Sequence, residues 1–422
     1  MNFADKVDAI GRRMKEESVS LKDSLRDIMT VEVTDEELPK GVSRLIYNHC
    51  LNKTEVYDSL FEMKCVKKTY QKKLDQAIAD GHVDEPIYHH RKHLFTRAHL
   101  QQIMQYFEFE KYSDFYESFV VIVSNYKGGT GKSTTAVTLA TKAALDLDLN
   151  AKVCLLDLDP QGSAARGIIQ IDESREQHYI TIADLQCYDL TEEQGDENQV
   201  KALLEHGVPF EQIVLASVFN THLPNLDVMT AFPTDEKFSD YYMASDEEKQ
   251  VQLLSRLKKE IIPILKSKYD IIILDLPPQN SPIVWSALEA ANGVLTPISP
   301  KAYDYASTES YLLTIGDIAR NLPSGGGNIS YFRVLPVNYN EREKHERKTF
   351  NRLLRSVRDD LVVSPIYHSP LFLEAASLNR TIYDIKKSES NCTAMQYDEA
   401  ISSSNKAYKA FIDEIKIKAT KG

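Results

Sequence analysis

The sequence has 422 residues, 42% of them hydrophobic, and a formal net charge of −12. This length predicts two or three domains rather than one core. The acidic balance excludes a uniformly basic nucleic-acid-binding surface, so any DNA contact has to come from local basic patches. No run approaches the roughly 20 apolar residues of a membrane-spanning helix, and the first residues lack the apolar region of a secretion signal. The five cysteines lie far apart without metal-ligand spacing, which predicts reduced thiols in a cytoplasmic protein.

Residues 1–40 are expected to form an amphipathic N-terminal helix. A near-heptad apolar stripe predicts it, made of Phe3, Val7, Ile10, Met14, Leu21, Leu25 and Ile28. Such a stripe needs a partner surface. We assign the segment as a dimerisation arm, and packing on its own domain is the alternative.

Residues 41–117 predict a small DNA-binding domain. Thr54 and Thr96 are expected N-caps, and Gly81 is expected to end a helix. Helices are predicted over residues 41–50, 53–61, 69–80 and 97–107, with β-type sequence over residues 82–95. Helix, turn, helix and hairpin is the order of a winged helix-turn-helix.

Residues 118–422 predict an α/β domain. Short apolar segments alternate with helical ones and are expected to be strands, at residues 119–125, 151–159, 269–278, 294–298 and 332–337. Buried strands alternating with helices predict a mostly parallel sheet covered by helices on both faces.

The first of these strands leads into a phosphate-binding loop, KGGTGKST, at residues 127–134. Glycines let backbone N–H groups converge on phosphate oxygens, and the following helix N-terminus adds a positive dipole end. The lysine of such a loop neutralises the β and γ phosphates, and the hydroxyl after it holds Mg²⁺. Asn125 stands where the general motif has its first glycine, so the matching form is KGGxGK[ST].

KGGTGKST resembles the deviant Walker A motif of the ParA/MinD ATPase family. LLDLDPQGS (residues 155–163) is similar to the second family motif, and IIILDLPP (residues 271–278) resembles its Walker B motif. VLPVNYNER (residues 334–342) is similar to a family segment that lies near the adenine. The resemblance covers roughly residues 118–418, and the N-terminal extension resembles that of the large ParA class, whose winged helix binds its own operator.

Residue roles follow from the chemistry and the resemblance together. Lys132 is expected at the β and γ phosphates, Thr134 at the α phosphate and Ser133 at Mg²⁺. Asp157 and Asp275, at the ends of adjacent strands, suit water ligands of that ion. The other loop residues expected to hold nucleotide are Gly128, Gly129, Thr130 and Gly131.

Three further roles come from the resemblance. It implies that Asp159 positions the attacking water, and that Lys127 reaches across a homodimer to the partner's ATP; a solvated loop lysine is the alternative for Lys127. It places Asn338 at the adenine. Lys127, Lys132 and Asp159 are therefore the expected catalytic residues of an ATPase that converts ATP and water to ADP and phosphate slowly.

DNA contacts are expected at three basic patches. A run without acidic residues, 63–73, spans the turn and the first part of the predicted recognition helix, and further cations lie in the predicted wing and in residues 342–358. A solvated charged face is the alternative for each. The assigned residues are Lys67, Lys68, Lys72, Lys73, Arg91, Lys92, Arg347, Arg352 and Arg355.

The resemblance implies a partition ATPase. An ATP-bound dimer would bind nucleoid DNA non-specifically, and a ParB-like centromere-binding partner would stimulate hydrolysis, so that a plasmid or chromosome is segregated. Operator binding through the winged helix would repress the protein's own operon. The alternative is a MinD-like membrane-associated ATPase, which would use residues 402–418 as an amphipathic membrane helix. An iron–sulfur reductase is disfavoured because Cys154 lies inside a predicted buried strand.

Overall fold

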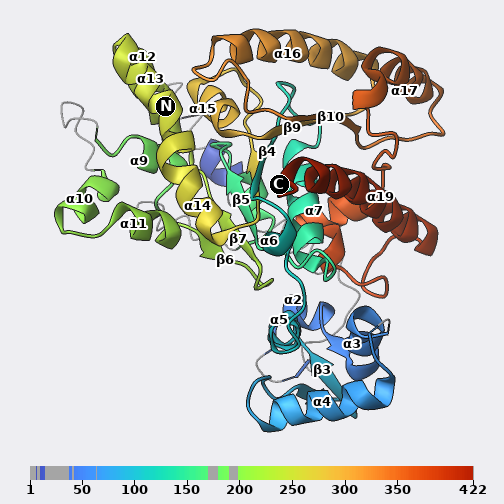
Figure 1. Ribbon diagram of the computed structural model, residues 1–422. Helices are drawn as coiled ribbons and strands as arrows, with labels where there is room; N and C mark the ends of the chain where they lie inside the picture. The colour runs from blue at the N-terminus through green and yellow to red at the C-terminus, as the bar shows by residue number, and fades with distance from the viewer. Residues whose placement is uncertain are drawn as a thin grey trace.

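The computed structural model describes residues 6, 10–14, 38–39, 42–62, 64–169, 179–189 and 198–421. Most of the predicted N-terminal arm lies outside these residues; Ile10 and Met14 lie in a short helical stretch with exposed side chains. A small domain, formed by residues 42–109, projects from a larger α/β domain (Figure 1).

The helices and the hairpin of the small domain follow the predicted order, whereas β1 was not predicted. Its helix pair is followed by a two-stranded hairpin that β1 extends to a three-stranded antiparallel sheet. Tyr70, Leu74 and Ala77 form the buried face of α4, against Val56 and Phe61. The elements are α2 Arg44–Asn48, β1 Leu51–Asn52, α3 Lys53–Leu60, α4 Lys67–Ala79, β2 Ile87–His89, β3 Lys92–Phe95 and α5 Arg97–Tyr106.

The predicted N-cap is confirmed for α5 and wrong for α3. Thr96 caps α5 as predicted, and its side chain accepts from the His99 N–H. For α3 the predicted cap Thr54 is wrong. Asn52 is the N-cap, accepting from the N–H groups of Thr54 and Glu55, because Glu55 completes a capping box only in that register.

The larger domain is built on a seven-stranded sheet with the order β10-β9-β4-β8-β5-β7-β6. All neighbouring strands are parallel except β6, which pairs antiparallel with β7. The mostly parallel sheet was predicted, whereas β6 and β7 were not. The strands are β4 Phe119–Val123, β5 Val153–Asp157, β6 Phe219–Asn220, β7 Leu226–Met229, β8 Ile271–Asp275, β9 Gly293–Ile298 and β10 Tyr331–Pro336.

Helices bury both faces of this sheet, which explains the unbroken apolar strands. In β4, Val120 and Ile122 face one core, and Val121 and Val123 face the other. The second core includes α7 and the C-terminal helix α19. The helices are α6 Tyr112–Phe115, α7 Lys132–Leu145, α8 Ser163–Arg166, α9 Ile182–Gln186, α10 Gln199–Glu205, α11 Phe210–Ala216, η4 Pro233–Glu236, α12 Lys237–Ala244, α13 Glu247–Arg256, η5 Leu257–Ile261, α14 Ile262–Lys268, α15 Pro282–Ala290, α16 Ala302–Asn321, α17 Lys344–Val357, η6 Arg358–Asp360, α18 Pro370–Ser377, η7 Ile382–Asp384 and α19 Ala394–Ala419.

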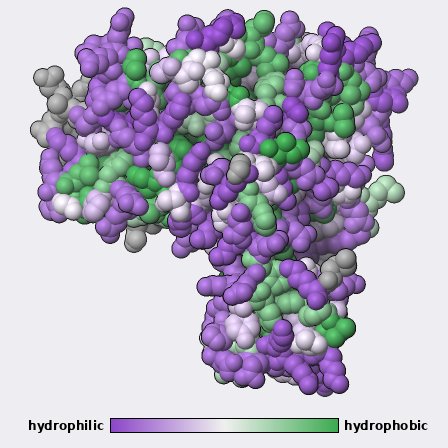
Figure 2. Space-filling view, viewed as in Figure 1, coloured by the Kyte–Doolittle hydropathy of each residue, from purple (hydrophilic) through white to green (hydrophobic). Residues whose placement is uncertain are grey.

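The C-terminal helix bears on the membrane alternative. Tyr408, Phe411, Ile412 and Ile415 of α19 are buried in the domain core, so this apolar face is not presented to a membrane. Within the described part of the chain, no helix has the length and apolar character needed to span a bilayer. The surface in view is mostly hydrophilic, with scattered hydrophobic side chains (Figure 2).

Candidate nucleotide-binding site

The predicted phosphate loop joins the carboxyl end of β4 to the first turn of α7. Gly129 and Gly131 have φ values of 75° and 79°, a left-handed conformation that favours glycine, and Gly131 is the N-cap of α7. Side chains at these two positions would strain the turn. The loop and helix N-terminus therefore form the anion-binding arrangement expected from the sequence.

Lys132 is buried at the base of this loop. Its Nζ donates to the Lys127 carbonyl oxygen at 3.2 Å, and the side chain is only 6% exposed. Burial lowers the pKa of Lys132, while the nearby carboxylates of Asp275 and Asp159 act in the opposite direction. A buried ammonium group held by one carbonyl is prepared to pair with an incoming anion.

Two carboxylates meet at the ends of neighbouring strands. Asp157 of β5 and Asp275 of β8 are register partners, and both are almost completely buried. Burial raises the pKa of each; the charge of Asp157 raises that of Asp275 further, and the charge of Asp159 does the same for Asp157. For Asp275, Ser133 donates a hydrogen bond and Lys132 adds a positive charge, both of which lower its pKa.

Asp157 also has a structural role that the sequence did not indicate. Its Oδ2 accepts from the N–H groups of Ala164 and Ala165 at 3.0 and 2.9 Å, and its Oδ1 accepts from the Asp159 N–H at 3.1 Å. These bonds hold the segment after β5 against the start of α8. They also fix Asp159 beside the loop.

A cavity of about 550 Å³ opens over the phosphate loop, a volume typical of small-molecule sites. The predicted residues that line it are Gly128, Gly129, Gly131, Lys132, Ser133, Thr134 and Asp159. Its opposite wall was not predicted and includes Gln161, Arg166, Pro278, Phe372, Arg380 and Thr381. Arg166 and Arg380 add positive charge to a site already suited to phosphates.

Four other predicted residues do not line this cavity. Lys127 Nζ pairs with Asp304 Oδ1 of α16 at 2.5 Å, and the Thr130 hydroxyl donates to the Lys127 carbonyl. Asp157 and Asp275 lie beneath the loop rather than at the wall. Neither carboxylate therefore contacts the space over the loop directly.

Asn338 also lies outside the cavity. It is exposed with φ 52°, and its Oδ1 contacts His368 Nδ1 at 2.7 Å. The neighbouring Val337 is the residue that approaches the loop: a Cβ at position 131, which Gly131 lacks, would lie 3.3 Å from Val337 Cγ2. The structure therefore gives no contact between Asn338 and the predicted phosphate site.

The predicted DNA-binding residues lie away from this cavity. Lys67, Lys68, Lys72 and Lys73 are exposed on α4, opposite its buried face. Arg91 follows His90 in the turn between β2 and β3, where both have positive φ, and Lys92 begins β3. These cations and the exposed Arg347, Arg352 and Arg355 of α17 thus belong to two different domains.

The basic helix α17 differs from the prediction in its apolar face. From helical spacing, the sequence predicts that Leu353, Leu354 and Val357 anchor this helix. Leu353 is buried, but Leu354 is 38% exposed. Arg352 lies over the Tyr305 ring at 4.4 Å from its centre, so this arginine is partly fixed by α16.

Comparison with known proteins shows what the larger domain is similar to. A family model described as an AAA domain matches residues 118–324. This part of the chain is therefore similar to the AAA domain family. The matched segment contains the phosphate loop, both buried carboxylates and Asp159, but ends before α17, α18 and α19.

Relatives of the AAA domain support a ParA-family ATPase. The chain is similar to plasmid partition protein A of Escherichia coli, with 28% identity over 54% of this chain and 54% of that protein. The sporulation initiation inhibitor protein Soj of Bacillus subtilis is 28% identical over 48% of this chain and 67% of its own length. The chromosome-partitioning ATPase Soj of Thermus thermophilus is 27% identical over 62% and 86%. In several curated relatives the match spans only 54% to 66% of the relative's length.

Solved structures support the fold around the AAA domain. A structure described as a partition protein has a TM-score of 0.63 at 17% identity and covers 97% of this chain and 98% of its own. A Cyanothece McdA variant, solved in complex with ATP, has a TM-score of 0.51 at 17% identity over 70% and 97%. The first of these similarities extends over the small domain as well as the sheet.

Proposed function

We propose that this protein is a slow, Mg²⁺-dependent ATPase of DNA partition. The observation that carries the proposal is the glycine-lined loop at the N-terminus of α7, with Lys132 buried behind it and Asp157 and Asp275 at the ends of β5 and β8. This arrangement offers backbone N–H groups and a cation to a triphosphate, and carboxylates to hydrated Mg²⁺.

The proposed roles follow the geometry. Lys132 binds the β and γ phosphates, Ser133 ligates Mg²⁺, and Asp157 and Asp275 hold its water ligands. Asp159, at the cavity wall, orients the attacking water, which adds to the γ phosphorus as the bond to the leaving ADP oxygen breaks. Lys127 is proposed to leave Asp304 and neutralise charge on the ATP of a partner copy.

We further propose that nucleotide controls DNA binding. The ATP-bound homodimer binds nucleoid DNA non-specifically through α17, and a ParB-like partner stimulates hydrolysis and releases it. The small domain acts as a winged helix-turn-helix that binds the operator through α4 and the β2–β3 hairpin. Exposed lysines on the outer face of α4 support this assignment. A cytoplasmic, nucleoid-associated protein would follow.

A Lys132→Ala substitution tests the nucleotide site. We expect ATP affinity to fall at least tenfold, because Lys132 is the only buried cation among the described residues that line the cavity. Isothermal titration with ATP and Mg²⁺ measures this effect, and Lys68→Ala on α4 is the control for an exposed lysine. Unchanged ATP affinity in a folded Lys132→Ala protein would refute the proposed function.

Operator and random duplexes test the DNA part of the proposal. We expect random DNA to be bound with ATP only, and operator DNA to be bound with ADP as well. Equal binding of both duplexes in all nucleotide states would contradict nucleotide control.

A further inference from the structure

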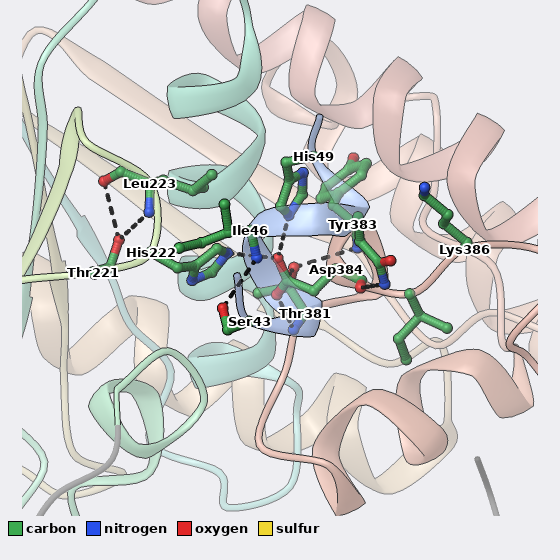
Figure 3. Close-up of polar contacts among 12 residues, drawn as sticks. Ser43, Ile46, His49, Thr221, His222, Leu223, Thr381, Tyr383, Asp384 and Lys386 are labelled. Atoms are coloured by element: carbon green, nitrogen blue, oxygen red, sulfur yellow. Dashed lines mark hydrogen bonds and ion pairs between the residues drawn. The ribbon is translucent and has the colours of Figure 1, made fainter. Parts of the chain in front are cut away.

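A cluster of potential metal ligands lies at the junction of the two domains, outside the nucleotide site. His49 follows α2, His222 lies between β6 and β7, and Asp384 ends η7. The Nε2 atoms of His49 and His222 lie 2.7 and 2.8 Å from the same oxygen, Asp384 Oδ1. Figure 3 shows the two imidazoles approaching this carboxylate from separate segments.

The three side chains are nearly inaccessible to solvent, with exposed fractions of 5%, 8% and 1% for His49, His222 and Asp384. Thr381 fixes the carboxylate by donating its N–H and hydroxyl to Asp384 Oδ2 at 2.7 and 2.8 Å. Asp384 Oδ1 is thereby left facing the two imidazoles. One ligand atom from each residue lies within 4.8 Å of the other two.

We propose that His49, His222 and Asp384 bind a divalent transition-metal ion, with Zn²⁺ as the matching chemistry. Two imidazole nitrogens and one carboxylate oxygen form a ligand set that Zn²⁺ accepts, with water as the fourth ligand. Zinc bonds of about 2.0–2.1 Å separate neighbouring ligands of a tetrahedron by about 3.3 Å. The two observed contacts would lengthen by about half an ångström, which small imidazole rotations provide.

Coordination needs neutral imidazoles and an ionised carboxylate. Metal binding would therefore replace the protons shared between the two Nε2 atoms and Asp384 Oδ1.

Bound metal would connect the small domain to the larger α/β domain. Asn48 already donates to the Asp384 carbonyl oxygen at 2.9 Å, and Arg44 pairs with Glu389 at 3.5 Å, so α2 is docked at this point. Thr381 both fixes Asp384 and lines the nucleotide cavity. The ion would therefore stabilise the domain junction directly beside the nucleotide wall.

Metal content and Co²⁺ substitution test the proposal on the full chain. Nucleotide-free protein is stripped with 1,10-phenanthroline at constant Mg²⁺, then titrated with Zn²⁺ or Co²⁺. We expect one equivalent of Zn²⁺ by elemental analysis, and visible d–d absorption typical of four-coordinate Co²⁺. His49→Gln and His222→Gln should each lower the affinity at least tenfold.

The matched control is the double variant His90→Gln, His93→Gln, which removes exposed histidines of the β2–β3 hairpin and should keep full stoichiometry. If the junction variants fail to fold, the wild-type melting temperature decides: it should rise with one equivalent of Zn²⁺ and fall on chelation. A wild type that binds no Zn²⁺, or junction variants that bind as tightly as wild type, would leave the cluster a hydrogen-bonded triad and overturn the proposal.

Discussion

Buried charge is concentrated around the phosphate loop. Burial disfavours the charged forms of Lys132 and of the Asp157–Asp275 pair. The opposite charges of the lysine and the carboxylates partly offset this cost. Bound ions of either sign would therefore stabilise this site: an anion would stabilise the charged form of Lys132, and a cation would stabilise the ionised carboxylates. This balance explains why ionisable groups are retained in the domain core.

The carboxylate pair predicts a specific pH dependence. The folded-state pKa of Asp275 is raised, so folding favours its protonated form and stability falls as pH rises from about 4 through the raised value. Asp275→Asn removes this ionisation. Without Mg²⁺ and nucleotide, the variant should melt above wild type at pH 8 and show a smaller difference at pH 5, by thermal denaturation.

Mg²⁺ should reverse the comparison, because the cation needs ionised carboxylates. Wild type should gain melting temperature from Mg²⁺ with ATP at pH 8, and Asp275→Asn should gain less. An Asp275→Asn protein with the wild-type pH profile would contradict the raised pKa.

At the scale of elements, the N-cap decides where a helix begins, and its buried residues decide which face is exposed. The capping box of Asn52 and Glu55 sets where α3 begins, and the buried Tyr70 and Leu74 set which face of α4 is presented outward. The same division holds for α17, where Leu353 is buried while its arginines are exposed. The packing of the apolar faces of α4 and α17 thus leaves the basic residues of both helices exposed.

The cap makes a stability prediction for the small domain. Asn52→Ala removes the acceptor for two N–H groups and should cost about 1 kcal/mol in unfolding free energy. Thr54→Ala should cost less, because Thr54 is inside the helix and only accepts from Lys67 Nζ at 3.3 Å. Urea denaturation of both variants measures the difference; an equal cost would argue against Asn52 as the cap.

The α17 arginines make a binding prediction. Arg352→Glu with Arg355→Glu should lower ATP-dependent affinity for random duplex DNA at least tenfold, because attraction to phosphates becomes repulsion. Lys409→Glu with Lys418→Glu makes the same charge change on exposed positions of α19 and is the control. Fluorescence anisotropy at fixed salt measures both, and equal losses would indicate a net-charge effect rather than a patch on α17.

At the scale of the whole molecule, the Lys127–Asp304 ion pair links the loop to α16 within one chain. If Lys127 acts on the nucleotide of a partner copy, this internal contact has to break when the dimer forms. ATP would then favour the dimer by offering the lysine a more highly charged partner.

Lys127→Ala tests that link. We expect the variant to bind ATP within a few-fold of wild type but to lose ATP-dependent dimerisation, as measured by light scattering after size-exclusion chromatography. Asp304→Ala is the companion variant and should dimerise at lower ATP concentration, since Lys127 is released. A Lys127→Ala protein that still dimerises with ATP would rule out its role across the interface.

Local pattern was sufficient for much of this protein. Unbroken apolar runs identified the central strands, and the loop glycines and Lys132 identified the phosphate site, because both signals lie in contiguous residues. The edge strand β6 and its neighbour β7 were missed because each is short. Leu354 was misassigned because helical spacing alone does not show how far a neighbouring element covers the face.

The sequence by itself determined the parallel α/β core, the phosphate loop and the order of elements in the small domain, since these depend on residues close in the chain. Only the tertiary structure decided the far cavity wall at Phe372 and Arg380, the pairing of Lys127 with Asp304, and the meeting of His49 with His222 and Asp384. These partners lie more than 150 residues apart in the chain. Their contacts arise from the packing of whole elements, which no local periodicity records.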